Sequence, residues 1–254
     1  MSKKSLLPLW LVIVTILSYG QSSQSLVNDW MNPAVFENNQ TSPHARIIPF
    51  KTHESALTMD PSVSPYCLTL NGTWKFLLAD HPDLVPDGFP DPRYNSSQWA
   101  EIQVPSNWET EGFGHPKFRN IAMTIETKPP LVPGYYNPTG CYRRTFNIPS
   151  DWKNRVILLR FEGVKSASLV WINGHHAGYN QGGFEPAEYN ITNLVKPGRN
   201  VIAVQVMRYS DGSFLENQDM WRLSGIFRDV VLIAKPKVHL HDYFVYTVFD
   251  SDYK

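Results

Sequence analysis

The sequence predicts an all-β protein, an antiparallel jelly-roll β-sandwich. The chain of 254 residues contains 20 Pro and 15 Gly, a content typical of short strands joined by many turns. Short segments that are apolar or alternate in polarity recur along the chain, separated by long polar loops. No segment of useful length repeats its apolar residues with the period of an amphipathic helix.

The predicted strands have two kinds of pattern. A first group alternates or is bounded by turn residues: residues 70–78, 102–104 and 140–146. A second group is nearly continuously apolar, as expected for strands buried on both faces: residues 156–161, 167–172, 201–207 and 230–234. Asn173-Gly174 predicts a tight hairpin, with Tyr179 on the returning strand. About eight such strands make a jelly roll.

The first 20 residues have the pattern of a signal peptide. A basic start, Met1 to Ser5, precedes the apolar stretch Leu6 to Leu17, which is short for a membrane span. Small residues at Ser18 and Gly20 predict cleavage there. We therefore expect export, to the periplasm or the cell exterior, without stable membrane insertion; an uncleaved anchor is the alternative.

Three further regions follow. Residues 21–66 are irregular, and we expect an N-terminal arm that packs Trp30 on the domain. Residues 67–235 are long enough for one sandwich with its own core. Residues 236–254 alternate again and are predicted to begin a second, truncated domain, because one strand cannot bury its own face. Alternatively, this strand pairs back onto the sandwich.

The charge and the cysteines exclude some classes of function. Lys and Arg together equal Asp and Glu in number, so no electrostatic attraction to nucleic acid or to an anionic membrane is expected. Export permits a disulfide between Cys67 and Cys141, but spacing alone does not show that they meet. Two buried thiols on separate strands are the preferred interpretation.

The 208–229 segment joins the last two apolar runs and fits no strand or helix period. It contains aromatic rings beside carboxylates and amides, the groups that stack on sugar rings and bond to their hydroxyls. Long, side-chain-rich connections are usually functional. The alternative is a surface loop anchored in the core by Trp221 and Phe227.

Residues 211–229 read Asp-Gly-Ser-Phe-Leu-Glu-Asn-Gln-Asp-Met-Trp-Arg-Leu-Ser-Gly-Ile-Phe-Arg-Asp. This motif resembles one in the N-terminal sugar-binding domain of family 2 glycoside hydrolases, in particular the β-galactosidases. The resemblance extends to Val-Pro-Ser-Asn-Trp at 104–108, Asn-Pro-Thr-Gly-Cys-Tyr at 137–142 and Trp-Ile-Asn-Gly at 171–174. It covers about residues 28–250.

The resemblance implies a galactose-binding-domain-like jelly roll, then an immunoglobulin-like domain begun by residues 236–254, then a barrel with two catalytic glutamates. The activity implied is retaining hydrolysis of β-galactosides or oligosaccharides, with no catalytic residue in this segment. We accordingly interpret the acids that could suggest a local pair as surface groups or partners of Arg: Glu162, Glu185, Glu188 and Glu216.

The resemblance implies two substrate-binding residues in this sequence, Asp211 and Asn120. Asp211 matches an aspartate that reaches the galactose pocket and holds Na⁺, since a carboxylate binds both hydroxyls and hard cations. Asn120 matches an asparagine that bonds to the sugar, since an amide donates and accepts. The structural alternatives are a turn at Asp211-Gly212 and a loop cap at Asn120. The resemblance also implies Mg²⁺, mostly with ligands elsewhere, and a homo-oligomer.

Some features remain open. Ala122 and Arg119 depart from the family wording, so the loop around Asn120 and the sugar preference can differ. His115 and the pair His175-His176 show no third ligand at metal spacing and are interpreted as solvated. Trp108 and Trp221 are expected to anchor the core rather than stack on sugar. The functional alternatives are a free-standing glycan-binding module, or another specificity such as glucuronidase or mannosidase.

Overall fold

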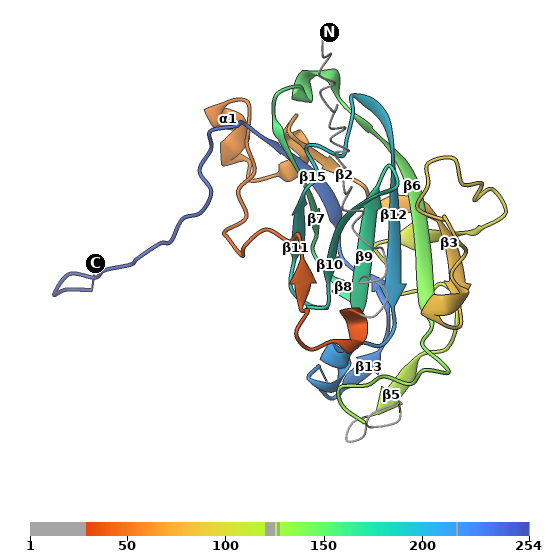
Figure 1. Ribbon diagram of the computed structural model, residues 1–254. Coiled ribbons are helices and arrows are strands. Elements are labelled where there is room, and N and C mark those ends of the chain that lie inside the picture. The colour runs from red at the N-terminus through yellow and green to blue at the C-terminus, as the bar shows by residue number, and fades with distance from the viewer. Residues whose placement is uncertain (1–28, 120–124, 126–127, 217, 254) are drawn as a thin grey trace, which may run out of the picture.

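The computed structural model describes residues 29–119, 125, 128–216 and 218–253. Its main feature is two facing antiparallel sheets, one of seven strands and one of four (Figure 1). The seven-stranded sheet has the order β1 (Glu37–Asn38), β10 (His175–Asn180), β9 (Ala167–Ile172), β12 (Gly198–Met207), β6 (Thr139–Ile148), β3 (Gly72–Ala79) and β4 (Ala100–Val104). The four-stranded sheet has the order β11 (Ala187–Asn190), β7 (Val156–Phe161), β15 (Val230–Lys235) and β2 (Cys67–Thr69). The predicted antiparallel sandwich is confirmed.

Short elements complete the described chain. Two small sheets pair β13 (Met220–Arg222) with β5 (Lys117–Arg119), and β14 (Gly225–Ile226) with β8 (Val164–Lys165). The helical turns are α1 (His53–Leu57), η2 (Asp29–Met31), η3 (Pro61–Val63), η4 (Pro82–Leu84), η5 (Ser150–Trp152) and η6 (Asp211–Phe214). Across these described residues, no helix has the length and apolar character to cross a membrane. The predicted signal peptide, residues 1–20, lies outside the described residues.

The core between the sheets is rich in aromatic rings. Trp74, Phe76, Trp108 and Tyr142 are all nearly inaccessible to solvent and belong to one apolar cluster. A Cβ atom at Gly140 would lie 2.7 Å from the Trp108 ring and 2.8 Å from the Phe76 ring. Any larger residue at this point of β6 would displace the rings, so the glycine allows Trp108 to lie directly on the sheet.

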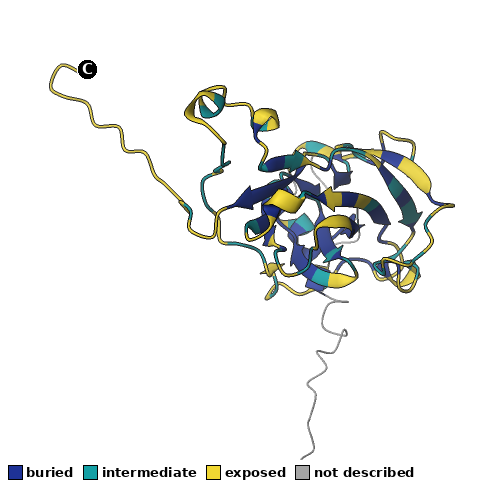
Figure 2. Ribbon diagram, turned by 90° about the horizontal axis from the view of Figure 1, so that it is seen from above, coloured by how far each residue is buried: buried dark blue, intermediate teal, exposed yellow. Residues whose placement is uncertain are grey.

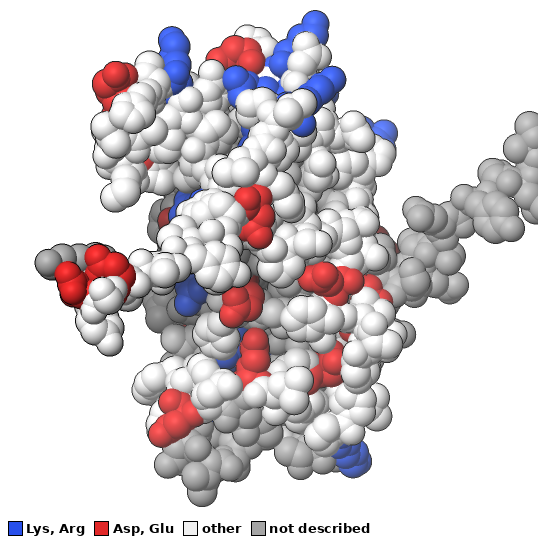
Figure 3. Space-filling view, turned by 90° about the vertical axis from the view of Figure 1, so that its left-hand side faces the viewer, with Lys and Arg blue, Asp and Glu red and all other residues white. Residues whose placement is uncertain are grey.

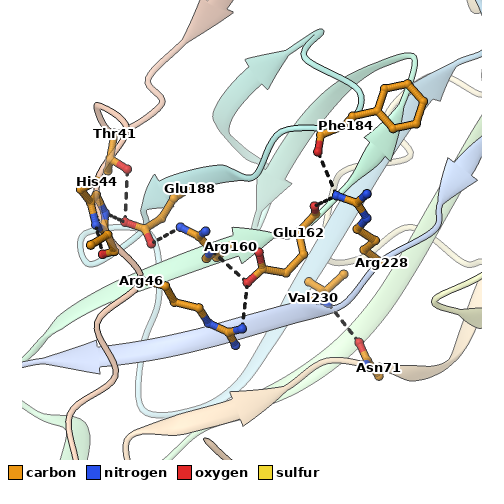
Figure 4. Close-up of polar contacts among 11 residues, drawn as sticks. Thr41, His44, Arg46, Asn71, Arg160, Glu162, Phe184, Glu188, Arg228 and Val230 are labelled. Carbon is orange, nitrogen blue, oxygen red and sulfur yellow. Dashed lines mark hydrogen bonds and ion pairs between the residues drawn. The ribbon is translucent and has the colours of Figure 1, made fainter. Parts of the chain in front are cut away.

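The N-terminal arm is attached to the sandwich in two places. Trp30 is only 3% exposed and packs in a cluster with Tyr179, Met207 and Tyr209, as the sequence predicted. Further along, a network of polar contacts joins the arm to the four-stranded sheet (Figure 4). In this network His44 Nε2 lies 2.9 Å from Glu188 Oε1.

Two arginines extend the arm network. Glu188 lies 3.5 Å from Arg160 on the adjacent strand β7, and Arg160 donates to Glu162 at 3.0 Å. Arg46 of the arm also reaches Glu162, at 3.6 Å. Figure 3 shows acidic side chains along the middle of this side of the molecule, with Lys and Arg mostly at its upper end.

Residues 236–253 contain no strand and extend away from the sandwich (Figures 1 and 2). Their alternating apolar residues are all exposed, by between 53% and 92%: Val238, Leu240, Tyr243 and Val245. The described tail therefore neither pairs back onto the sandwich nor forms the strand that the alternation suggested, in keeping with the need of a strand for a partner. The second domain predicted from residue 236 stays a prediction.

The two cysteines are unpaired. Cys67 lies on β2 and Cys141 on β6, in different sheets, and both are buried and free. The preferred interpretation of two buried thiols on separate strands is confirmed.

Candidate sugar site around Asp211

The candidate site begins where the central strand β12 ends. After Met207 the chain turns through Ser210 into the short helix η6, which opens with Asp211. Ser213 Oγ accepts a hydrogen bond from the Ser210 backbone amide at 3.0 Å, and Ser210 Oγ lies 2.7 Å from Ser166 Oγ on the neighbouring connection. Serines at both ends of this turn fix its start, so Asp211 has a defined position.

Asp211 is buried, and only one of its two carboxylate oxygens accepts a hydrogen bond from a described residue. Its Oδ2 accepts a hydrogen bond from Gln181 Nε2 at 3.3 Å. Its Oδ1 is buried and has no hydrogen-bond partner among the described residues. Burial raises the pKa of this carboxyl, against the lowering effect of Gln181 and of nearby backbone amides. An oxygen without a partner in such a place is the kind of group that a ligand satisfies.

Gln181 is held in its orientation by a second residue. Its Oε1 accepts a hydrogen bond from the Tyr179 hydroxyl at 2.8 Å, so the amide nitrogen is left to face Asp211. Burial raises the pKa of Tyr179 and keeps its hydroxyl a donor. The two hydrogen bonds, from Tyr179 to Gln181 and from Gln181 to Asp211, therefore fix which carboxylate oxygen of Asp211 is engaged and which is free.

A second acid lies near the end of η6. Glu216 Oε1 accepts from the Gly183 amide at 3.1 Å, while its Oε2 is buried without a hydrogen-bond partner among the described residues. Burial raises the pKa of Glu216, and the neighbouring Lys165 opposes that shift. Together, Asp211 and Glu216 hold the 181–183 turn against the 208–229 segment.

An internal ion pair secures the base of the same segment. Arg208 lies 3.3 Å from Glu109, and both side chains are buried. Glu109 also accepts from the Ser224 amide at 2.8 Å, and Arg208 donates to the Arg222 carbonyl at 2.9 Å. Breaking one half of such a pair leaves a buried charge uncompensated, so this contact is structural.

Asn120, the other predicted substrate-binding residue, lies outside the described residues, and so does Ala122. The preceding strand β5 is described, and its pairing with β13 sets Arg119 opposite Met220. The 208–229 segment and the end of β5 are therefore adjacent, although the sequence separates them widely.

One of the two tryptophan predictions is wrong. Trp108 is fully buried in the core, as expected, but Trp221 is 57% exposed. Strand β13 points Arg222 inward, and alternation then turns Trp221 outward, where it contacts the half-exposed Phe118 with ring centroids 5.5 Å apart. Phe227, its partner in the anchoring interpretation, is partly buried against Phe184.

The four acids considered for a local catalytic pair have structural partners or face solvent. Glu188 pairs with His44 and Arg160, and Glu162 with Arg160 and Arg46. Glu216 is fixed by Gly183, and Glu185 is exposed. Their interpretation as surface groups or partners of Arg fits the described contacts for three, whereas Glu216 bonds to backbone and faces Lys165 instead.

A small hollow lies at the 208–229 segment. The hollow lined by Lys165, Glu216 and Arg222 has a volume of about 20 Å³, room for about one water molecule. Within the described ranges, no three side chains of His, Cys, Asp or Glu gather as a metal site. Asp211 Oδ1 suits one bond to a hard cation such as Na⁺.

A family comparison decides the assignment. Residues 68–236 match the model of the glycosyl hydrolases family 2, sugar binding domain. The chain belongs to this family. The β-galactosidases of Priestia megaterium and Alteromonas mediterranea are 42% and 44% identical over 88% and 89% of this chain. The chain spans only 22% of the length of each relative.

A solved structure supports the same fold. The Bacteroides uniformis beta-glucuronidase is 28% identical over 67% of this chain, with a TM-score of 0.50, and the match covers 18% of that protein. The sandwich of this family 2 member is thus shared with enzymes whose names give different sugars.

Sequence reasoning missed the supports of Asp211. Tyr179 is on β10, and Gln181 directly follows that strand. The only signal was the returning strand after Asn173-Gly174, which predicted Tyr179 but not the residue that it would contact.

Proposed function

We propose that this family 2 chain is the N-terminal, sugar-contacting part of an exported retaining β-galactosidase that hydrolyses terminal β-D-galactosides. The observation that carries the proposal is the β-galactosidase relatives, 42–44% identical over nearly nine-tenths of the chain. Those relatives extend well beyond the matched part, which is consistent with catalytic glutamates outside this chain. A retaining mechanism requires two such carboxyls about 5–5.5 Å apart.

In this proposal Asp211 is a binding residue. Its Oδ1 lacks a partner among the described residues, and its position is fixed through Oδ2 by Gln181. The free oxygen accepts from a galactose hydroxyl or binds Na⁺, and both interactions are strongest with an ionised carboxylate. Asn120 supplies a second polar contact to the sugar. Mg²⁺ remains a family expectation, with most of its ligands outside this segment.

The proposed setting of the enzyme rests on sequence and resemblance. The pattern of residues 1–20 supports export to the periplasm or the cell exterior. The resemblance supports a homo-oligomer, and the zero net charge gives no reason to expect nucleic acid as a partner.

The test is hydrolysis of a chromogenic β-galactoside by the full reading frame that contains this chain. Wild type, Asp211→Ala and Asp211→Asn are compared in potassium buffer titrated with sodium at constant ionic strength. We expect activity in wild type, a fall of about 100-fold or more in both variants, and loss of the sodium response. An inactive wild type of confirmed fold would refute the proposal, and full activity in both variants would refute the role of Asp211.

A β-glucuronidase is the second candidate, because solved structures of that name share the fold. Its relatives are less identical and match less of the chain than the β-galactosidases do. A panel of aryl glycosides on the same protein distinguishes the two. Binding of galactosides without hydrolysis would instead indicate a free-standing glycan-binding module.

A further inference from the structure

We infer that a basic hollow on the outer face of the seven-stranded sheet binds an oxyanion, a phosphate or sulfate group. The hollow has a volume of about 230 Å³ and lies between three strands and residues 92–97. Four of its lining residues are basic. Lys75, Arg143 and Arg199 are on its face of the sheet. The Arg144 guanidinium turns to the other face, 5.9 Å from the ring centroid of the core residue Trp74. The others are Pro92, Tyr94, Asn95, Ser96, Ser97, Thr145 and Val201, with no Asp or Glu among them.

Strand register brings the basic residues together. Lys75 of β3 is directly opposite Arg143 of β6, and Thr145 of β6 is opposite Val201 of β12. Arg199 lies two residues before Val201 on β12, so both side chains are on the same face of the sheet. Side chains opposite each other in an antiparallel pair are about 5 Å apart at Cβ, and like charges there repel. A bound anion would offset that repulsion.

The positive charge of the hollow is poorly compensated. Arg143 is buried and donates to the backbone carbonyls of Phe89, Asp91 and Tyr94. Arg144 donates to the carbonyls of Leu70 and Asn71. These acceptors carry no net charge, and within the described parts of the chain no ion pair is formed by Arg143, Arg144 or Arg199.

The nearby acids compensate the charge of the hollow only in part. Lys75 lies 3.0 Å from Glu101, whose side chain is largely exposed. Asp91 is paired with the exposed Arg93 at 2.7 Å, which lowers the pKa of Asp91 to about 2, and Arg143 of the hollow adds a smaller lowering. Lys75 is therefore the one lining cation with an ion-pair partner among the described residues, and that pair is solvent-exposed and weak.

The chemistry of the lining selects the ligand. Guanidinium groups bind phosphate and sulfate oxygens through paired N–H donors, and hydroxyls at Ser96, Ser97 and Thr145 add further donors. The ligand is either the free ion or a phosphate or sulfate substituent on a sugar. This hollow shares no lining residue with the surroundings of Asp211, and the inference does not depend on the proposed galactosidase activity.

The experiment uses the whole 254-residue chain, titrated with sodium phosphate or sodium sulfate against sodium chloride at equal ionic strength. Calorimetry and thermal unfolding are the readouts, since a ligand of the folded state raises Tm in a saturable way. A parallel titration compares galactose 6-sulfate with galactose. Saturable binding of the free ions indicates a free-ion site, and binding of the sulfated sugar alone indicates a substituent on a sugar.

The decisive variant is Lys75→Gln combined with Arg199→Gln, which spares the buried Arg143. We expect binding to weaken about tenfold or more, because charge-assisted hydrogen bonds are lost. The control is Lys51→Gln with Lys153→Gln, two exposed cations away from the hollow, which removes the same charge and should leave affinity unchanged. No binding beyond that in chloride, or equal weakening in both double variants, would overturn the inference.

Discussion

His44 Nε2 and Glu188 Oε1 lie 2.9 Å apart, although 144 residues separate them in the chain. Their side chains are 3% and 4% exposed, so the contact is shielded from water. It joins the arm to β11 at the edge of the four-stranded sheet (Figure 4). Polar contacts of this kind require one geometry, so they give the arm a defined path across the sandwich.

The first prediction concerns this contact. Glu188→Gln removes the charge that faces both His44 and Arg160 while keeping the side-chain size. We expect a loss of about 1–3 kcal/mol in the free energy of unfolding, because buried partners lose a charged acceptor. Urea denaturation measures it. The control Glu185→Gln changes an exposed acid nearby and should stay within about 0.5 kcal/mol of wild type; equal losses in both variants would contradict the assignment.

The second prediction contrasts two tryptophans. Trp108→Ala should destabilise the fold by about 3–5 kcal/mol, because it opens a cavity beside Phe76 in the core. Trp221→Ala should cost less than about 1 kcal/mol, because its ring is mostly in water. Thermal unfolding of the two variants tests the contrast. A large loss at Trp221 would show that this ring is covered in solution.

The third prediction concerns the pH dependence of stability. Burial raises the pKa of Asp211 above its ordinary value of 3.8, so the folded chain holds this proton more tightly than the unfolded chain. The charged carboxylate thus opposes folding once the pH rises through the folded-state pKa. Asp211→Asn should stabilise the chain by about 0.5–2 kcal/mol at pH 7, and the gain should disappear below pH 3.8.

Denaturant titrations of wild type and Asp211→Asn from pH 3 to 8 measure this difference. Asp91→Asn is a suitable contrast, because the pKa of Asp91 is lowered by Arg93 to about 2 and the sign is reversed. If the stabilisation caused by Asp211→Asn does not change with pH, the charge of Asp211 is compensated in the folded chain.

The fourth prediction concerns the thiols. Burial raises the pKa of Cys141 to about 12 and also raises that of Cys67. Because the thiolate is the reactive form, neither cysteine should react with a thiol reagent at pH 8 in the folded chain, and both should react in urea. Oxidants should produce no intramolecular disulfide. Rapid labelling of the folded protein would mean that one strand opens easily.

The predictable part of the fold was set by local pattern. Strands β7 and β9 occupy the residues that their continuous apolar runs predict. A strand that is buried on both faces is apolar at every position, and this pattern is visible in the local sequence. The pairs β5–β13 and β14–β8 were missed, because two or three residues carry no period. Such short strands exist only through a partner distant in the sequence.

The same limit applies to the site. The 208–229 segment could be recognised as functional because its acids and aromatic rings lie within one stretch of sequence. The contact of Gln181 with Asp211 depends on how the strands are ordered in the sheet, which no local pattern contains. The exposure of Trp221 depends on its pairing with strand β5, which the local sequence does not reveal, so the expectation of a core position is wrong.

The central ladder has a consequence for how this fold diversifies. Strands β6 and β12 pair over ten residues in the middle of the large sheet, and the turn that presents Asp211 begins four residues after β12 ends. The base of the turn is therefore held by the most extensive pairing in the described sandwich. In evolutionary terms, an exchange of the site-facing side chain at Asp211 leaves this starting point in place, so a new specificity can arise without a new scaffold.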